Sequence, residues 1–347
     1  MEKRVTVVQW GLGSMGSGCA KMALQKKGLD VVGAIANSPN KAGKDLGEYL
    51  GLGKNGVIIS SDAIEVMRRT KPDVVLLATN SFTKEVYPEI KKIIENGSNC
   101  ITIAEELAYP KASEPELAKQ IDELAKLKGV TVLGTGINPG FILDVLIIAL
   151  TGVCLDVKKI KAARINDLSP FGATVMKSQG VGTTPEQFHK GVEDGTIQGH
   201  IGFPQSIHLI AGALGWEVEK VVQTREPIIS NKFRETPHVK VEPGMVAGCR
   251  HCAQGIVGGK VLIELEHPQQ IHPGMEGVAT GDYIRIEGTP NINMEIKPEI
   301  PGGLGTIALA VNMIPHVLKS KPGLVTMVDL PVPRALMGDI RSLMEEK

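Results

Sequence analysis

The 347-residue sequence predicts an α/β protein whose N-terminal part is a doubly wound parallel sheet. Through the first 140 residues, short apolar strand-like segments alternate with helix-like segments, a pattern typical of parallel sheets. A glycine-rich turn joins the first strand to the first helix. After about residue 155 the strand-like runs alternate apolar and polar residues instead. This change predicts a second α+β domain with a largely antiparallel sheet.

The elements of the first part follow from their apolar runs and their end signals. Asp62 suits the first turn of a helix, and Gly97 and Gly129 are placed to end two others. We expect strands at residues 5–9, 29–36, 73–78, 100–104 and 130–133, and helices at 16–27, 62–70, 84–96 and 114–128.

The part of the chain after residue 155 shows the same kinds of signal. We expect strands at residues 157–166, 260–266 and 283–287, and helices at 184–194, 205–214 and 305–318, the last followed by a proline-rich tail near residues 329–333. The predicted domains are residues 1–150 and 151–304, with residues 305–347 returning to the first domain.

The turn after the first strand has G-x-G-x-x-G spacing. The first glycine permits the sharp turn, the second leaves no side chain between backbone and phosphate, and the third lets the helix pack closely. The helix N-terminus then offers free N–H groups to a pyrophosphate. We therefore expect a Rossmann domain that binds a dinucleotide through Gly11, Leu12, Gly13, Ser14, Met15 and Gly16.

The residues after the second strand bear on the choice of dinucleotide. An acid that reads the ribose is usual there, but this chain has Ala36, Asn37 and Ser38. No carboxylate repels a 2′-phosphate, and Asn37, Ser38, Asn40 and Lys41 offer hydrogen bonds without an arginine nearby. We predict that both NAD and NADP are used.

Composition excludes several classes of protein. The 38 basic and 38 acidic residues balance, and aromatic residues make up only 3%, so a nucleic-acid binder is not expected. The longest apolar run, residues 145–150, is too short to cross a bilayer. A strand beginning by Val5 leaves no room for a signal peptide, and five scattered cysteines do not suggest disulfides. We expect a soluble cytoplasmic protein without a membrane partner.

Candidates for chemistry lie where parallel strands end, because ligands bind beyond those carboxyl ends. Thr79 and Asn80 are expected near the nicotinamide, although Ser81 beside them also suits a helix N-cap. Glu105 and Glu106 follow a buried strand, where paired carboxylates hold an ammonium group or move a proton. The alternative is that both are exposed loop acids.

Four further polar residues are candidates for binding the substrate or for catalysis. Asn138 lies in a glycine- and proline-fixed turn, and Asp144 begins the next helix, where it either meets the ligand or complements the helix dipole. Arg164 suits a substrate carboxylate, or forms a surface salt bridge. His200, among glycines, is a candidate to face the cleft.

The pair Cys249 and Cys252 gives two zinc ligands at most, and no second C-x-x-C or C-x-x-H follows. No metal site is expected. On a strand, Cys249 and His251 would face one side and Arg250 and Cys252 the other, which favours packing or interface roles.

Several stretches together carry a family resemblance, namely residues 9–16, 77–81, 134–141, 310–315 and 322–324. They resemble the 2,4-diaminopentanoate dehydrogenases of anaerobic ornithine degradation, which are relatives of dihydrodipicolinate reductase. The reductases proper carry a histidine pair and a Lys-x-Asp-Ala-Pro-Ser-Gly-Thr stretch. The corresponding residues 165–172 lack both, which favours an amine substrate.

The resemblance implies that NAD(P)+ takes hydride from C4 of 2,4-diaminopentanoate, after which the iminium is hydrolysed to 2-amino-4-oxopentanoate and ammonia. Glu105 is the first candidate to take the substrate proton and His200 the second, while Arg164 would hold the C1 carboxylate. Alternatives are a reductase of a cyclic imine or semialdehyde, a homoserine dehydrogenase, and a non-catalytic dinucleotide sensor. The antiparallel sheet is commonly a dimer face in such proteins, so we expect a homodimer.

Overall fold

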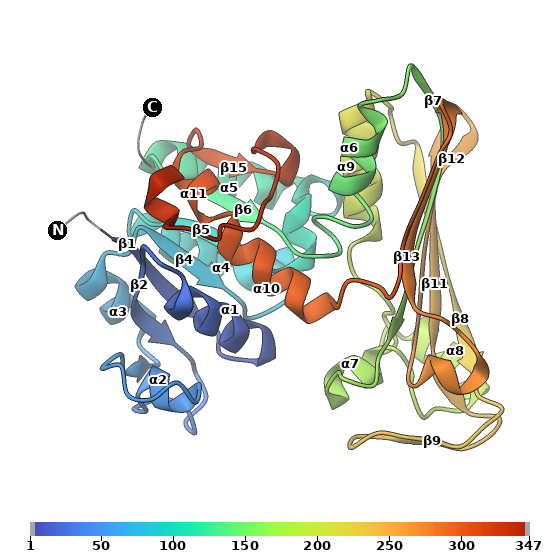
Figure 1. Ribbon diagram of the computed structural model, residues 1–347, viewed down its shortest axis with the longest axis horizontal. Helices are drawn as coiled ribbons and strands as arrows, with labels where there is room; N and C mark the ends of the chain where they lie inside the picture. The colour runs from blue at the N-terminus through green and yellow to red at the C-terminus, as the bar shows by residue number, and fades with distance from the viewer. Residues whose placement is uncertain (1–3, 344–347) are drawn as a thin grey trace. The chain divides into compact units, whose positions relative to one another are not determined.

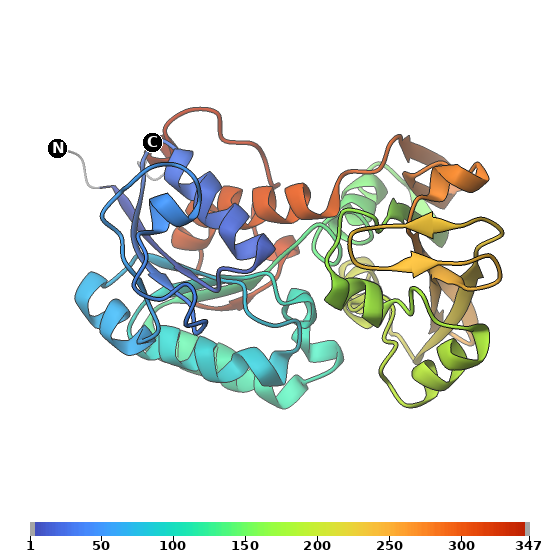
Figure 2. The ribbon, with the colours of Figure 1, turned by 90° about the horizontal axis from the view of Figure 1, so that it is seen from below.

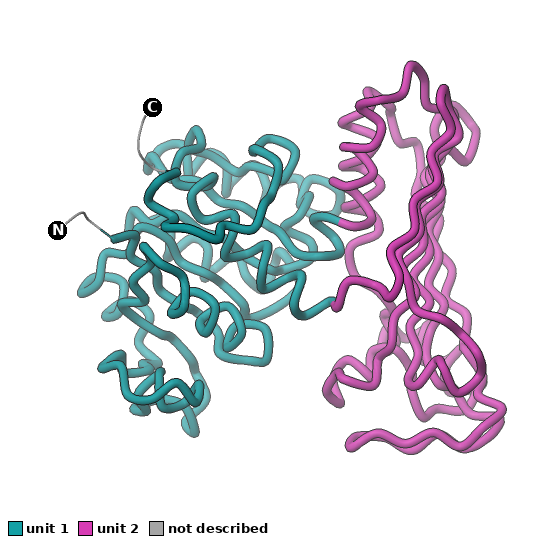
Figure 3. Tube along the Cα trace, viewed as in Figure 1, with its two compact units in different colours: residues 1–141, 302–347 teal, residues 142–301 magenta. Residues whose placement is uncertain are grey.

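The chain folds into two compact units, and each unit contains one large sheet (Figure 3). The computed structural model describes residues 4–343. Unit 1 contains residues 1–141 and 302–347, and unit 2 contains residues 142–301. The chain therefore leaves unit 1 once, builds the whole of unit 2, and then returns.

The sheet of unit 1 has seven strands in the order β15-β6-β5-β4-β1-β2-β3. Every neighbouring pair is parallel, as predicted. The strands are β1 (Val5–Trp10), β2 (Leu29–Ile35), β3 (Ile59–Ser60), β4 (Val74–Leu77), β5 (Asn99–Thr102), β6 (Thr131–Gly134) and β15 (Gly323–Val325). β15 comes from the tail, where the sequence indicated no strand.

Helices cover both faces of this sheet (Figure 1, Figure 2). One face carries α1 (Ser14–Gln25), α10 (Gly302–Asn312) and α11 (Ile314–Leu318), and the other carries α3 (Ala63–Thr70), α4 (Thr83–Glu95) and α5 (Pro115–Lys128). The short helix α2 (Leu46–Tyr49) follows β2. Apolar side chains of α3, α4 and α5 pack against β4 and β5 in one buried cluster.

The end signals read from the sequence act as expected in two helices. Asp62 caps α3, since its carboxylate accepts a 3.0 Å hydrogen bond from the backbone N–H of Glu65. Gly129 ends α5 in the left-handed conformation, with φ of 69°. The single late helix expected at residues 305–318 is wrong, because α10 ends at Asn312 and α11 begins at Ile314. Pro315 lies in the first turn of α11, where a missing N–H costs no hydrogen bond.

The sheet of unit 2 has six strands in the order β14-β13-β7-β12-β11-β8. All neighbours are antiparallel except β12 and β7, so the largely antiparallel sheet is confirmed. The strands are β7 (Asp156–Asp167), β8 (Lys220–Ile229), β11 (Val246–Val257), β12 (Lys260–Gln270), β13 (Gly281–Thr289) and β14 (Ile292–Ile296).

Smaller elements complete unit 2. Its helices are α6 (Val145–Thr151), α7 (Ala173–Ser178), α8 (Pro185–Glu193) and α9 (Phe203–Leu214), and β9 (Arg234–Glu235) pairs with β10 (Lys240–Val241). Ile207 of α9 packs on Gly255 of β11, where a Cβ would lie 2.7 Å from the isoleucine. The other face of the sheet carries ion pairs, such as Lys159 with Glu264. Among residues 4–343, no helix is long and apolar enough to cross a membrane.

Candidate active site

The turn after β1 is built so closely that only glycine fits at two of its positions. Gly11 has φ of +92°, and a Cβ there would lie 2.2 Å from the carbonyl oxygen of Ala78. A Cβ on Gly16, in α1, would lie 2.1 Å from the carbonyl oxygen of Gly11. These contacts bind the start of α1 to the ends of β1 and β4.

Gly13, the middle glycine, is different because nothing lies within 4 Å of a Cβ built on it. It is the N-cap of α1, and no side chain caps that helix. The N–H groups of the first turn, from Ser14 and Met15 onward, therefore remain for a ligand. Open space beside a glycine at an uncapped helix N-terminus fits the pyrophosphate of a dinucleotide.

A lysine lies beside this turn. The Nζ of Lys41 donates a 2.7 Å hydrogen bond to the carbonyl oxygen of Leu12, and the hydroxyl of Tyr49 reaches the same oxygen at 3.3 Å. Asn37 and Ser38 follow β2. Asn37 is exposed and Ser38 is half-buried. The backbone N–H of Lys41 donates to the carbonyl oxygen of Ser38, so these residues form one short turn.

Glu105 opens a short 3-10 helix (Glu105–Ala108) directly after β5. Burial raises the pKa of its carboxyl group, the charge of Glu106 raises it further, and a hydrogen bond from Ser81 opposes the shift. A carboxylate with a raised pKa is a stronger base than an exposed one. Glu105 therefore lies directly after a strand of the sheet with a carboxyl pKa above its usual value.

Glu106, which the sequence suggested as a substrate ligand, contributes to the start of α4. Its Oε2 accepts a 2.8 Å hydrogen bond from the backbone N–H of Thr83. The N-cap of that helix, Phe82, makes no side-chain capping bond of its own. The two neighbouring acids thus differ in role, since Glu106 satisfies a helix N-terminus.

Thr79 and Asn80 follow β4 and are exposed. The hydroxyl of Thr79 donates a hydrogen bond to Glu89 in α4. Burial raises the pKa of the Glu89 carboxyl group, and the Thr79 bond partly offsets this. The sequence did not point to Glu89, because a glutamate within an amphipathic helix resembles any solvated residue.

Asn138 and Asp144 lie on either side of the boundary between the units. Asn138 is half-buried in the turn after β6, and in the same turn the N–H of Ile137 donates to the hydroxyl of Thr306. Asp144 is fully buried and caps α6 through the N–H of Val145, at 2.6 Å. Its other oxygen accepts a 2.9 Å bond from Ser206 of α9. Asp144 therefore joins two helices of unit 2.

Arg164 is buried, so the alternative of a surface salt bridge is wrong. It pairs with Asp282 at 2.6 Å, and the carbonyl oxygen of Ile300 accepts a second bond from its guanidinium. The other oxygen of Asp282 accepts a 2.9 Å bond from the N–H of Ile300. Two of the five N–H groups of the Arg164 guanidinium are thus used to join β7 to β13 and to the segment after β14.

His200 belongs to a cluster of three buried histidines, His200, His251 and His267, which we term the histidine cluster. The backbone N–H of His200 donates a hydrogen bond to Nδ1 of His251 at 2.9 Å, and the ring centroids of His200 and His267 lie 4.8 Å apart. His251 and His267 are directly opposed on β11 and β12. The predicted strand alternation is confirmed here, since His251 is buried and Arg250 is exposed.

Burial keeps the histidine cluster uncharged. It lowers the pKa of His200 to about 3 and that of His251 to about 2, and holds the pKa of His267 well below its usual value. The sequence did not point to His267 as a candidate, because only the pairing of β11 with β12 places it opposite His251. Among residues 4–343, no group of three His, Cys, Asp or Glu is arranged to hold a metal ion.

Comparisons with known proteins agree with this architecture. Residues 4–102 match the family model for the dihydrodipicolinate reductase N-terminus, and residues 141–346 match the 2,4-diaminopentanoate dehydrogenase C-terminal domain. A 2,4-diaminopentanoate dehydrogenase of Acetoanaerobium sticklandii is 49% identical, with 100% of this chain and 99% of that protein covered. An amine dehydrogenase of Streptomyces virginiae is 24% identical over 96% and 98% of the two chains.

A solved structure is also similar. The amine dehydrogenase from Mycobacterium smegmatis superposes with a TM-score of 0.86 at 30% identity, covering 97% of this chain and 98% of that one. The fold, the glycine turn and these relatives define an oxidoreductase of the NAD(P)-binding dehydrogenase class. Within that class, the chain belongs to the 2,4-diaminopentanoate dehydrogenase family.

The geometry of the glycine turn predicts that alanine at Gly13 weakens cofactor binding, whereas alanine at Gly16 lowers stability. Gly13→Ala has room for its methyl group, so the melting temperature should change by about 2 °C or less while the Kd for NADH rises at least about tenfold. Gly16→Ala must displace the backbone of Gly11 and should destabilise by roughly 1–3 kcal/mol. Calorimetry and NADH fluorescence titration measure both effects. Equal losses of stability would contradict the assignment of Gly13 to the ligand.

The histidine cluster predicts acid sensitivity. Below the unfolded pKa of about 6.5, unfolded histidines take up protons that the buried rings do not. Stability should therefore fall from pH 7 to pH 5, by about 2 kcal/mol for each buried imidazole. Urea unfolding at both pH values tests this. His251→Gln should reduce the fall, whereas His189→Gln, at an exposed position, should not; identical falls in both variants would refute the explanation.

Proposed function

We propose that the protein catalyses the NAD(P)-dependent oxidative deamination of 2,4-diaminopentanoate at C4, giving 2-amino-4-oxopentanoate and ammonia. The observation that carries this proposal is the 49% identity over the full chain to a 2,4-diaminopentanoate dehydrogenase. The family model for the reductase N-terminus matches residues 4–102, which hold the glycine turn and none of unit 2. This match supports the proposed cofactor more strongly than the proposed substrate.

The proposed chemistry needs a base. Only a neutral amine has the lone pair that drives hydride loss, so the C4 ammonium group must first lose a proton. The bound nicotinamide supplies the hydride acceptor. Glu105 takes the proton in this proposal, because burial has raised its pKa and Ser81 orients it. Water then adds to the C4 iminium, and ammonia leaves.

The other candidate residues are assigned by what they contact. Thr79, Asn80 and Asn138 remain proposed ligand contacts at the carboxyl ends of β4 and β6. Glu106 is proposed to stabilise unit 1, and Asp144 and Arg164 to stabilise unit 2, because their charged atoms bond to other parts of the chain. His200 is proposed as a neutral group of unit 2 rather than the base.

We predict that both NAD and NADP serve as cofactors. No acid follows β2 to repel a 2′-phosphate, and Lys41 lies beside the glycine turn. Absorbance at 340 nm, at alkaline pH, should show NADH and NADPH formation with 2,4-diaminopentanoate and not with homoserine or meso-diaminopimelate. A preference above about a thousandfold, or roughly 4 kcal/mol, for one dinucleotide would refute dual use. Turnover of homoserine instead of the diamine would refute the proposed reaction.

The adjacent acids offer a matched test of the base. Glu105→Gln should lower kcat by about 10²- to 10⁴-fold and remove the acidic limb of the pH–rate profile. Glu106→Gln weakens a helix cap and should cost less than about 2 kcal/mol of stability, with kcat within a few fold of the parent. If Glu105→Gln kept most of kcat across the pH range, another group would be the base.

We propose that the protein is a homodimer formed through the outer face of the unit 2 sheet. Half-exposed apolar residues, Leu262 and Ile165, share that face with the ion-paired Lys159 and Glu264. Light scattering should give twice the chain mass of 37.0 kDa. Leu262→Glu should shift it toward the monomer, while Lys158→Glu, at the exposed start of β7, should not. A monomeric parent protein would refute the proposal.

A further inference from the structure

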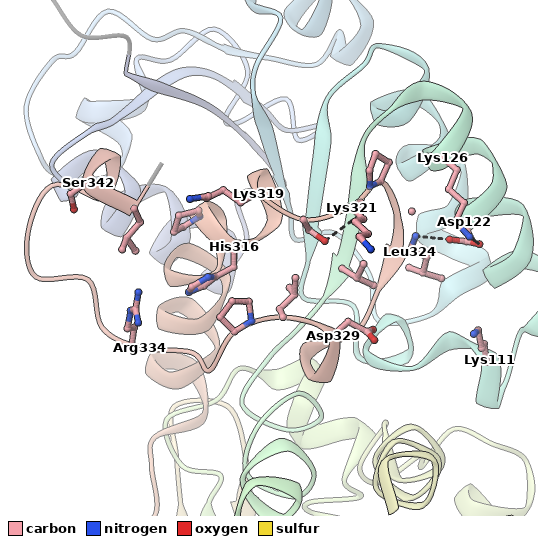
Figure 4. Close-up of a pocket in the computed structure, with 18 residues that line it drawn as sticks. Lys111, Asp122, Lys126, His316, Lys319, Lys321, Leu324, Asp329, Arg334 and Ser342 are labelled. Atoms are coloured by element: carbon pink, nitrogen blue, oxygen red, sulfur yellow. Dashed lines mark hydrogen bonds and ion pairs between the residues drawn. The ribbon is translucent and has the colours of Figure 1, made fainter. Parts of the chain in front are cut away.

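A cavity of about 950 Å³ lies in unit 1 beside the edge strand β15 (Figure 4). Its walls come from α11, from β15 and the segments on either side of it, and from α5. β15 is four strands from β1 in the sheet, or roughly 19 Å at about 4.8 Å per strand. The cavity is therefore separate from the glycine turn.

The wall of this cavity is positively charged, although the whole chain has a formal net charge of zero. Five lysine and arginine side chains line it, against two aspartates: Lys111, Lys126, Lys319, Lys321 and Arg334, with Asp122 and Asp329.

Both aspartates already have partners within unit 1. Asp122 pairs with Lys126 at 2.6 Å and accepts a 3.0 Å bond from the N–H of Leu324. Asp329 accepts bonds from the N–H and the hydroxyl of Thr326, each at 2.7 Å. Asp122 is thus paired with Lys126, whereas the hydrogen bonds to Asp329 leave its negative charge in place, so the wall as a whole keeps an excess of positive charge.

Four of these cations form no salt bridge among the described residues. Across residues 4–343, Lys111, Lys319, Lys321 and Arg334 have no ion-pair partner within 4.0 Å. Lys319, Lys321 and Arg334 are all exposed, and like charges gathered around one concave surface attract an anion into it. Arg334 in particular offers a planar fork of donors that suits phosphate and carboxylate groups.

His316 supplies a second and independent observation. It lines the same cavity and is only 8% exposed, and its buried Nε2 has no hydrogen-bond partner among the described residues. Burial, and next the charge of Arg334, lower the pKa of its ring, which is therefore neutral at pH 7. A neutral imidazole can still donate one N–H to an anion.

We propose that this cavity binds a multivalent small-molecule oxyanion, held by Arg334, Lys319 and Lys321 with a hydrogen bond from His316. Its volume lies at the upper end of small-molecule sites, so it has room for a body larger than inorganic phosphate. Phosphate and carboxylate groups share the required chemistry. The site does not depend on the proposed reaction, because it involves none of the residues assigned to catalysis.

Calorimetric titration of the NADP-saturated protein tests the proposal, since the dinucleotide then blocks the glycine turn. Tripolyphosphate and citrate are the two probes. We expect at least one of them to bind at one site per chain. Arg334→Gln should weaken that binding at least tenfold, and Lys158→Gln, on the exposed start of β7, should leave it unchanged. Binding of tripolyphosphate alone would identify a phosphate site, and binding of citrate alone a carboxylate site.

His316 gives a matched pair of variants. His316→Gln keeps a side-chain N–H donor and should bind within threefold of the parent, whereas His316→Leu should lose at least fivefold. In the parent protein, bound anion should raise the pKa of His316 in an NMR titration. The proposal is overturned if neither probe binds at millimolar concentration, or if Arg334→Gln and Lys158→Gln bind equally well. Arg334 is exposed, so its variant stays informative even where His316→Leu fails to fold.

Discussion

The close contact between Gly11 and the carbonyl oxygen of Ala78 is the constraint on which the dinucleotide site depends. It leaves no room for a side chain, and it brings the end of β1 against the end of β4. Gly16 then rests on the carbonyl oxygen of Gly11, to which the side chain of Gln9 also donates a 3.0 Å bond. The first turn of α1 is thereby fixed with its N–H groups free, as an anion-binding end of the sheet requires.

The same sheet explains why polar residues far apart in the chain lie at one edge. Parallel strands end on the same side, so the segments after β4 and β5 present Thr79 and Glu105 to that edge. The returning chain strengthens this framework. Ile307 of α10 lies so near Gly18 of α1 that a Cβ there would be 2.2 Å from it. The C-terminal segment therefore packs directly on the helix that bears the glycine turn.

Much of the fold could be predicted because strand alternation and glycine spacing are local signals. β15 escaped detection because it has three residues, and its first, Gly323, needs φ of +136° beside Asp122. The roles of the charged candidates depended on distant partners. Arg164 meets Asp282, 118 residues away, and Asp144 meets Ser206, 62 residues away. A sequence shows the charge of such a residue but not which distant group forms its hydrogen bond or ion pair.

In the proposed reaction hydride leaves C4 of the diamine, and isotope transfer tests this step most directly. With 2,4-diaminopentanoate deuterated at C4, the reduced dinucleotide recovered from the reaction should carry the deuterium, and turnover should slow if hydride transfer limits it. With the label at C2, the reduced dinucleotide should carry none. Label arriving from C2, or no transfer from C4 during turnover, would contradict oxidation at C4 and the account built on it.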